Sequence, residues 1–248
     1  MTRRLVVCLT AMVALVAGSC GDDAGTPDAA GTDPIEVGEQ YLRALAGQGD
    51  RSLDDVVALA SPDSVADRYA RHTRALRDIQ VDAGESPEAV EVTVTGARAT
   101  VTFTPDGGAP VATEWADFQL GGDGLLSSFT IDGVSLEGRL LGSGEPHVVD
   151  GVSARILSGF HLVTSGRPLV IVEIANEAEG TYVLGSAAYR TSDGSEFATS
   201  PSGDALGVPS AGSNRVALIF DEADFGGSVM LDGDLDGAPV GHELEVDP

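Results

Sequence analysis

Residues 90–103 read VEVTVTGARATVTF, and this stretch decides how the first half of the chain is built. Apolar and polar residues alternate in it on both sides of Gly96. A two-residue period that is interrupted by a glycine turn predicts two antiparallel strands with one buried face. We therefore expect a β-hairpin here and a change from helix to sheet after Gly84.

The residues before and after this hairpin complete one structural unit. Helical patterns begin at three places: Asp33-Pro34, Ser52 and Ser61-Pro62. Asp is a frequent helix cap and Pro suits the first helical turn, so the first of these starts is the strongest. Strand-like runs follow at residues 90–94, 99–103, 111–120 and 125–131. Three helices followed by an antiparallel meander predict an α+β roll over residues 34–140.

The second half of the chain has a different pattern. Short strand-like runs, separated by turns rich in Gly and Ser, occupy residues 152–157, 169–175, 182–189, 215–220, 228–231 and 242–246. Six or seven strands of this kind in about 100 residues predict an all-β sandwich over residues 147–248. Residues 141–146, LGSGEP, are the expected linker, on which the two halves either pack together or swing apart.

Both halves also resemble known families. YLRALAGQGD at 41–50 and LASP at 59–62 are similar to the opening of cystatin-like rolls, the superfamily of nuclear transport factor two and ketosteroid isomerase. LVIVEIAN at 169–176 and SDGSEF at 192–197 resemble immunoglobulin-like domains of unknown function from secreted bacterial lipoproteins. The first resemblance implies a pocket inside the roll, and the second implies an extracytoplasmic binding or spacer module.

The N-terminus has the pattern of a signal peptide over residues 1–19. Two arginines precede thirteen uncharged residues, 5–17, a run shorter than the roughly 20 residues that cross a bilayer. Residues 16–20, VAGSC, resemble a bacterial lipobox with Ala17 in place of the usual leucine. That resemblance implies cleavage before Cys20, a diacylglycerol on its sulfur and an acyl chain such as palmitate on its amine. Secretion without a lipid is the alternative.

The residues after the signal peptide limit the chemistry of the mature protein. Residues 20–33 hold the cysteine and a flexible acidic tether without large apolar side chains. The only other cysteine is Cys8, which leaves with the signal peptide. A lone N-terminal cysteine excludes a disulfide within the chain, thiol catalysis and a cysteine metal site.

Composition narrows the class of function further. All 14 basic residues are arginine, which excludes lysine-dependent catalysis. The formal net charge of −25 argues against binding nucleic acid through its phosphates. We therefore expect a non-catalytic protein without a cofactor, anchored by lipid to the outer face of the cell membrane. Its partner would be an extracytoplasmic protein or a small ligand.

A second class of function is a calcium-stabilised adhesion or scaffold module. Four acids near the C-terminus fit the calcium-loop pattern D-x-D-x-D-G-x5-E: Asp232, Asp234, Asp236 and Glu243. Carboxylate oxygens at these spacings are the ligands that Ca²⁺ prefers. The alternative is an ordinary Asp-Gly turn between two strands.

A third class is an isomerase-like enzyme or ligand-binding protein that uses the pocket of the roll. The residues expected to face this pocket are Tyr41, Tyr69, His72, Trp115 and Asp117. A hollow pocket with a buried acid would favour catalysis, whereas an interior filled by side chains would favour the non-catalytic function.

The third helical pattern carries several arginines. Their spacing predicts ion pairs one helical turn apart, from Asp67 to Arg71 and from Arg74 to Asp78. Such pairs are typical of an exposed helix face, and an anion-binding site is the alternative.

Overall fold

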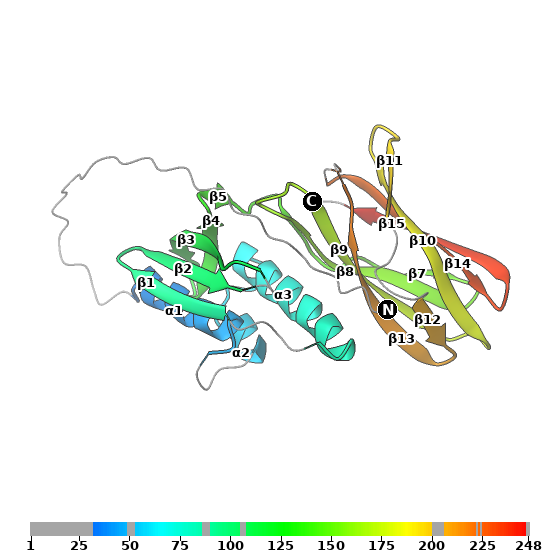
Figure 1. Ribbon diagram of the computed structural model, residues 1–248, viewed down its shortest axis with the longest axis horizontal. Coiled ribbons are helices and arrows are strands. Elements are labelled where there is room, and N and C mark those ends of the chain that lie inside the picture. The colour runs from blue at the N-terminus through cyan, green and yellow to red at the C-terminus, as the bar shows by residue number, and fades with distance from the viewer. Residues whose placement is uncertain are drawn as a thin grey trace.

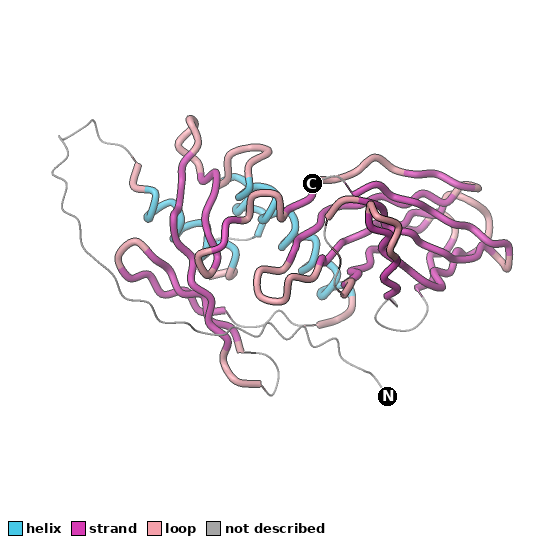
Figure 2. Tube along the Cα trace, turned by 90° about the horizontal axis from the view of Figure 1, so that it is seen from above, coloured by secondary structure: helices cyan, strands magenta, loops and turns pink. Residues whose placement is uncertain are grey.

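The computed structural model describes residues 32–48, 53–85, 90–104, 108–199, 206–221, 223 and 225–246. The signal peptide, Cys20 and most of the tether lie outside these residues. The described part of the chain is mostly β, with antiparallel sheets and few helices. The helices and the first sheet lie at one end of an elongated molecule, and two further sheets lie at the other (Figures 1 and 2).

Three helices come first: α1 (Pro34–Leu45), α2 (Leu53–Ala58) and α3 (Val65–Asp82). As predicted, Asp33 caps α1, and its carboxylate accepts a hydrogen bond from the N–H of Ile35 at 2.9 Å. The predicted start of α3 at Ser61-Pro62 is wrong by three residues. Ser64 is the cap instead, because its hydroxyl accepts a hydrogen bond from the N–H of Asp67 at 3.2 Å.

The first sheet contains five antiparallel strands in sequence order: β1 (Val90–Thr95), β2 (Arg98–Phe103), β3 (Val111–Leu120), β4 (Leu126–Ile131) and β5 (Val134–Ser135). The predicted hairpin is confirmed, since Thr95 pairs with Arg98 across its turn. Gly96 has a φ of 61° in this turn, which glycine adopts without strain. Helix α1 packs against β1 to β4, and α3 packs against β4.

The remaining strands form two antiparallel sheets. In one sheet β13 (Gly212–Ile219), β9 (Pro168–Asn176) and β8 (Val152–His161) are neighbours, and both β6 (Leu140–Leu141) and β7 (His147–Val149) pair with β8. The other contains β11 (Glu196–Thr199), β10 (Thr181–Thr191), β14 (Gly227–Leu235) and β15 (Ala238–Val246), with β12 (Leu206–Pro209) also on β10. Buried side chains of both sheets share one hydrophobic core, an arrangement compatible with a β-sandwich.

The two halves of the chain pack against each other through α3. This helix contacts β6, β8, β9 and β13, and it lies between the first sheet and the other two (Figure 1). Phe160 of β8 belongs to the core of the N-terminal half, where its ring meets that of Tyr69 edge-on at 5.4 Å. The first core therefore continues past residue 140, where the N-terminal half was predicted to end.

Candidate functional site

Most of the residues predicted to line a pocket in the N-terminal half form an aromatic cluster. The ring of Tyr69 lies edge-on to three others at centroid distances of 5.4 to 5.6 Å: Trp115, Phe129 and Phe160. Tyr41 is fully buried, and its hydroxyl donates to the carbonyl of Ala66 at 2.7 Å. Burial raises the pKa of Tyr69 to about 12 and that of Tyr41 well above its usual value. Both phenols are therefore neutral, and their rings pack against other aromatic rings in the region where a pocket was expected.

Asp117 points to solvent, contrary to the prediction that it faces the pocket. The pairing of β3 with β4 shifts register between Ala116 and Gln119. Asp117 sits in this irregularity with a φ of 53°, and its Oδ2 accepts a hydrogen bond from Thr130 Oγ1 at 3.0 Å. A strict alternation of inward and outward residues does not hold across such a bulge, so the side chain emerges on the outer side.

His72 lies at the junction between the two halves. Its side chain is 3% exposed, and its Nδ1 is 3.1 Å from the hydroxyl oxygen of Ser158 on β8. Its Nε2 is buried without a hydrogen-bond partner among the described residues. Burial lowers the pKa of His72 to about 4, so the imidazole is neutral near pH 7.

The four acids of the calcium pattern lie on the β14–β15 hairpin. Asp236 and Gly237 form its two-residue turn with φ values of 51° and 88°, as in a type I′ turn. The strands predicted at residues 228–231 and 242–246 therefore continue up to this turn. Asp232 and Asp234 are exposed on β14. The Asp-Gly turn, which was the alternative to a calcium loop, is confirmed at residues 236–237.

The carboxylates of the calcium pattern make structural contacts. Asp236 Oδ1 accepts a hydrogen bond from the N–H of Thr181 at 3.1 Å. Glu243 Oε1 accepts from Ser228 Oγ at 2.8 Å and from Arg190 Nη1 at 3.3 Å. No group of three side chains that could hold a metal ion occurs in the described part of the chain. Calcium binding stays a prediction.

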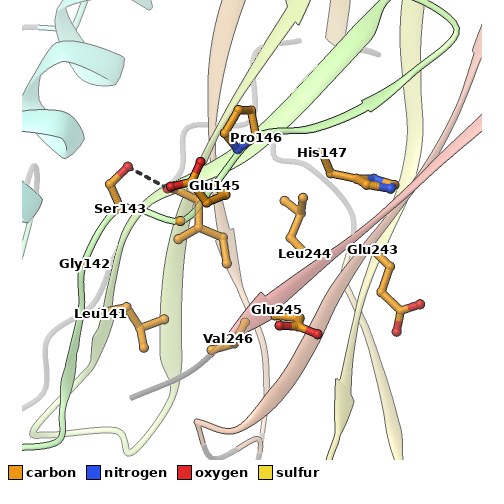
Figure 3. Close-up of a pocket in the computed structure, with 12 residues that line it drawn as sticks. Leu141, Gly142, Ser143, Glu145, Pro146, His147, Glu243, Leu244, Glu245 and Val246 are labelled. Atoms are coloured by element: carbon orange, nitrogen blue, oxygen red, sulfur yellow. Dashed lines mark hydrogen bonds between the residues drawn. The ribbon is translucent and has the colours of Figure 1, made fainter.

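A cleft of about 460 Å³ opens at one edge of the two C-terminal sheets. Residues 142–147 run along one side of it and residues 243–246 of β15 along the other (Figure 3). Its apolar lining consists chiefly of side chains that are at most 4% exposed: Leu141, Ile156, Leu244 and Val246. The cleft thus has a floor of core side chains, whereas residues 142–147 are exposed throughout.

Contacts to β8 hold the exposed segment in place. The N–H of Gly144 donates to the carbonyl of Ile156 at 2.9 Å, and Ser143 Oγ donates to the same oxygen at 3.3 Å. β6 and β7 pair with β8 at the two ends of the segment. The expected linker is therefore one wall of a preformed cleft.

The rim of the cleft is acidic. Glu243 and Glu245 are exposed and alternate along β15 with the buried Leu244 and Val246. Glu145 is exposed on the opposite wall. Negative charge therefore lines both sides of an apolar floor.

A pair of histidines closes the end of the cleft nearer the hairpin turn. The ring of His147, which lines the cleft, lies edge-on to that of His242 at 5.4 Å. His242 is 3% exposed, and burial, together with the adjacent His147, lowers its pKa. This contact brings β7 against β15 and limits the cleft to residues 243–246 of that strand.

The sequence alone did not reveal this cleft, and its one predicted site residue, Glu243, was expected to bind a metal. One local signal was present: apolar residues alternate with two glutamates at the end of the chain, as on an edge strand with one buried face.

The chain matches no protein-family model, no curated protein and no solved structure. Among the helices of the described residues, none combines the length and the apolar character needed to cross a bilayer.

Proposed function

We propose that this protein is a lipid-anchored, non-catalytic binding protein on the extracytoplasmic face of the cell membrane. Its binding site is the cleft between residues 142–147 and 243–246. The observation that carries the proposal is the cleft itself, which combines a preformed apolar floor with an exposed polar rim. Concave sites with a few polar groups around an apolar surface are the usual form of ligand sites.

The contacts of the polar side chains favour binding over chemistry. Ser143 Oγ is directed to the carbonyl of Ile156, and Glu243 is held by Ser228 and Arg190. A nucleophile would instead be paired with a base that activates it. The aromatic cluster around Tyr69 supports the same function, because its rings occupy the interior that an isomerase-like pocket would need.

The anchor rests on the sequence around Cys20. A short apolar run, small residues and a cysteine follow one another there, and an acidic tether comes next. Two acyl chains are sufficient for stable membrane attachment. A chain with a net charge of −25 is repelled by anionic head groups, so the lipid rather than the protein surface would hold it there.

We also infer the finer fold of each half. An α+β roll of the cystatin-like kind is supported by three helices followed by an antiparallel sheet whose strands keep sequence order. An immunoglobulin-like sandwich is supported by two antiparallel sheets around one core. The second half would then be the binding module, and the first half would pack against it through α3.

The anchor is tested on the native protein. Mass spectrometry of the N-terminal peptide from membranes should find Cys20 as the first residue, with a diacylglycerol on sulfur. Cys20→Ser should move the protein from the membrane to the soluble extracytoplasmic fraction. An unmodified Cys20 in the mature protein would leave secretion without an anchor.

The binding site is tested by photo-crosslinking in intact cells. A benzoylphenylalanine at Ser143, on the rim, should give a crosslinked product, while one at Asp193 should not. Asp193 is a matched control because it is exposed in the turn between β10 and β11, away from the cleft residues. Equal crosslinking at the two positions would overturn the assignment of the cleft.

A further inference from the structure

We infer that the cleft takes an extended peptide segment, which pairs with the free edge of β15 and alternates apolar with basic side chains. The inference rests on the proposed function, since it names the class of partner that occupies the same cleft. It follows from the backbone of β15, from the floor and from the charges on the rim.

Among the described residues, one side of the backbone of β15 pairs with no other strand. β15 is the end strand of its sheet, and its hairpin with β14 closes at the pair Leu235 and Ala238. This closing pair is hydrogen-bonded across the two-residue turn, and bonded and non-bonded pairs alternate from there. The residues whose backbone groups point away from β14 are then Pro239, Gly241, Glu243 and Glu245. Pro239 suits this position because proline has no N–H to donate.

Part of this edge is open. Near the turn, β7 lies beside β15 at the contact of His147 with His242. Beyond it, residues 142–146 are bonded to β8 and the cleft separates them from β15 (Figure 3). The open length covers residues 243–246, which corresponds to roughly 13 Å of strand.

The floor selects one set of side chains on the added strand. A strand placed beside β15 directs alternate residues to opposite faces of the sheet. Those on the inner face would meet Leu141, Ile156 and Leu244, which are buried apolar side chains. Apolar residues, for example Val or Ile, are therefore expected at every second position.

The rim selects the other set. Residues on the outer face of the added strand would lie beside Glu243 and Glu245, about 4.5–5.5 Å away between Cβ atoms. Opposite charges at this separation stabilise strand pairing. The carboxylate of Glu243 already lies 3.3 Å from Arg190, so Arg or Lys is expected chiefly beside Glu245. Glu145 on the facing wall adds negative charge on the other side.

The same charges disfavour two other occupants. A second copy that used the same edge would bring Glu243 and Glu245 close to their own counterparts, and like charges across strands are destabilising. The tether of this chain, residues 20–33, carries only acidic charges and would meet the same repulsion. A basic segment of another protein satisfies both the floor and the rim.

Two labelled peptides of equal composition test the inference. Ac-RVRVRVRVR-NH2 alternates as the cleft requires, whereas Ac-RRVVRRVVR-NH2 has the same charge without the alternation. Titration with the purified full chain in nonionic detergent, followed by fluorescence anisotropy, should give about tenfold tighter binding of the alternating peptide. Equal affinities would mean charge attraction alone and would overturn the inference.

Two variants at one position test the strand pairing. Glu245→Pro removes an outward N–H without removing a bond to β14, and Glu245→Ala is the matched control that keeps the N–H. The proline variant should bind both peptides equally, while the alanine variant should keep most of the preference for the alternating one. If both variants keep the preference, the edge of β15 is not used. Similar thermal unfolding midpoints confirm that both variants are folded.

The outcomes separate this inference from the proposed function. Crosslinks at Ser143 without any peptide preference would keep the cleft as a binding site and reject the basic strand. A dimer in size-exclusion chromatography that Glu245→Pro dissociates would replace the peptide with a second copy and so reject the inference too. Loss of the crosslinks would reject the proposed function itself.

Discussion

Asp78, near the end of α3, and Arg215, on β13, form an ion pair across the junction of the two halves. Arg215 Nη1 lies 2.7 Å from Asp78 Oδ2. The same guanidinium lies 3.6 Å from Glu173 Oε1, and Glu173 also accepts hydrogen bonds from Arg155. Two acids and two arginines thus link α3 to the sheet of β8, β9 and β13.

We expect Arg215→Ala to lower the free energy of unfolding by about 0.5–1 kcal/mol at low salt. The magnitude is that of a partly exposed pair, since the two side chains are 35% and 45% exposed. High salt should reduce the effect because it screens exposed charges. Urea denaturation of single and double variants with Asp78→Ala would give the coupling, and a coupling of zero at low salt would contradict the prediction. Arg98→Ala is the control for an exposed ion pair that does not cross the junction, because its partner Glu114 lies within the same sheet.

We expect stability to fall as the pH decreases from about 6.5 towards about 4, and His72 is one cause. Burial lowers the native pKa of His72 to about 4 from the unfolded value of 6.5. The unfolded chain therefore binds the proton first on acidification, and the native state loses up to about 3 kcal/mol over this interval.

The measurement for His72 is the unfolding free energy in urea at several pH values. His72→Gln should flatten the profile between pH 4 and pH 6.5, even if the variant is less stable at neutral pH. The difference between the two profiles separates the contribution of His72 to the unfolding free energy from that of the carboxylates that titrate in the same pH range. Parallel profiles would contradict the prediction.

We expect Gly38→Ala to destabilise the protein by about 1–3 kcal/mol, although alanine is normally the better residue within a helix. A Cβ on Gly38 of α1 would lie 2.5 to 2.8 Å from ring atoms of Phe118 on β3. Either the ring or the helix would have to move. Gly122→Ala is the control, because its Cβ would meet nothing within 4 Å, and thermal unfolding should show little change. Equal midpoints for the two variants would refute the close approach of α1 to β3.

Several local elements were predicted correctly from neighbouring residues. The cap at Asp33, the hairpin around Gly96 and the turn at residues 236–237 each depend on residues at most a few positions apart. The ion pair from Asp67 to Arg71 is also local, with both carboxylate oxygens 2.9 to 3.0 Å from Arg71 Nε. Patterns of this kind identify helices, strands and turns because the interaction partners are neighbours in sequence.

Partners that are distant in sequence left no such signal, and one predicted position was wrong. The pair of Arg74 with Asp78 stays a prediction, while the bond from Arg215 to the carboxylate of Asp78, 137 residues away, was not predicted. Asp117 was expected inside, yet a bulge in β3 turns it outward. The packing of α3 against the second half and the bulge in β3 produce no periodic pattern of residues, so the sequence could not predict them.

Amino-acid order alone was sufficient for most of the long strands and for the turns between them, since each depends on residue type and short spacing. The lipid anchor and the excluded chemistries stay predictions from the same kind of pattern. The cleft and the junction required the folded chain. The hydrogen bond from Gly144 to Ile156 and the contact of His72 with Ser158 join segments that are separated in the sequence. The way distant segments pack depends on the whole core rather than on any short stretch. For this reason residues 141–146, which were predicted to be a linker, form a wall of the cleft.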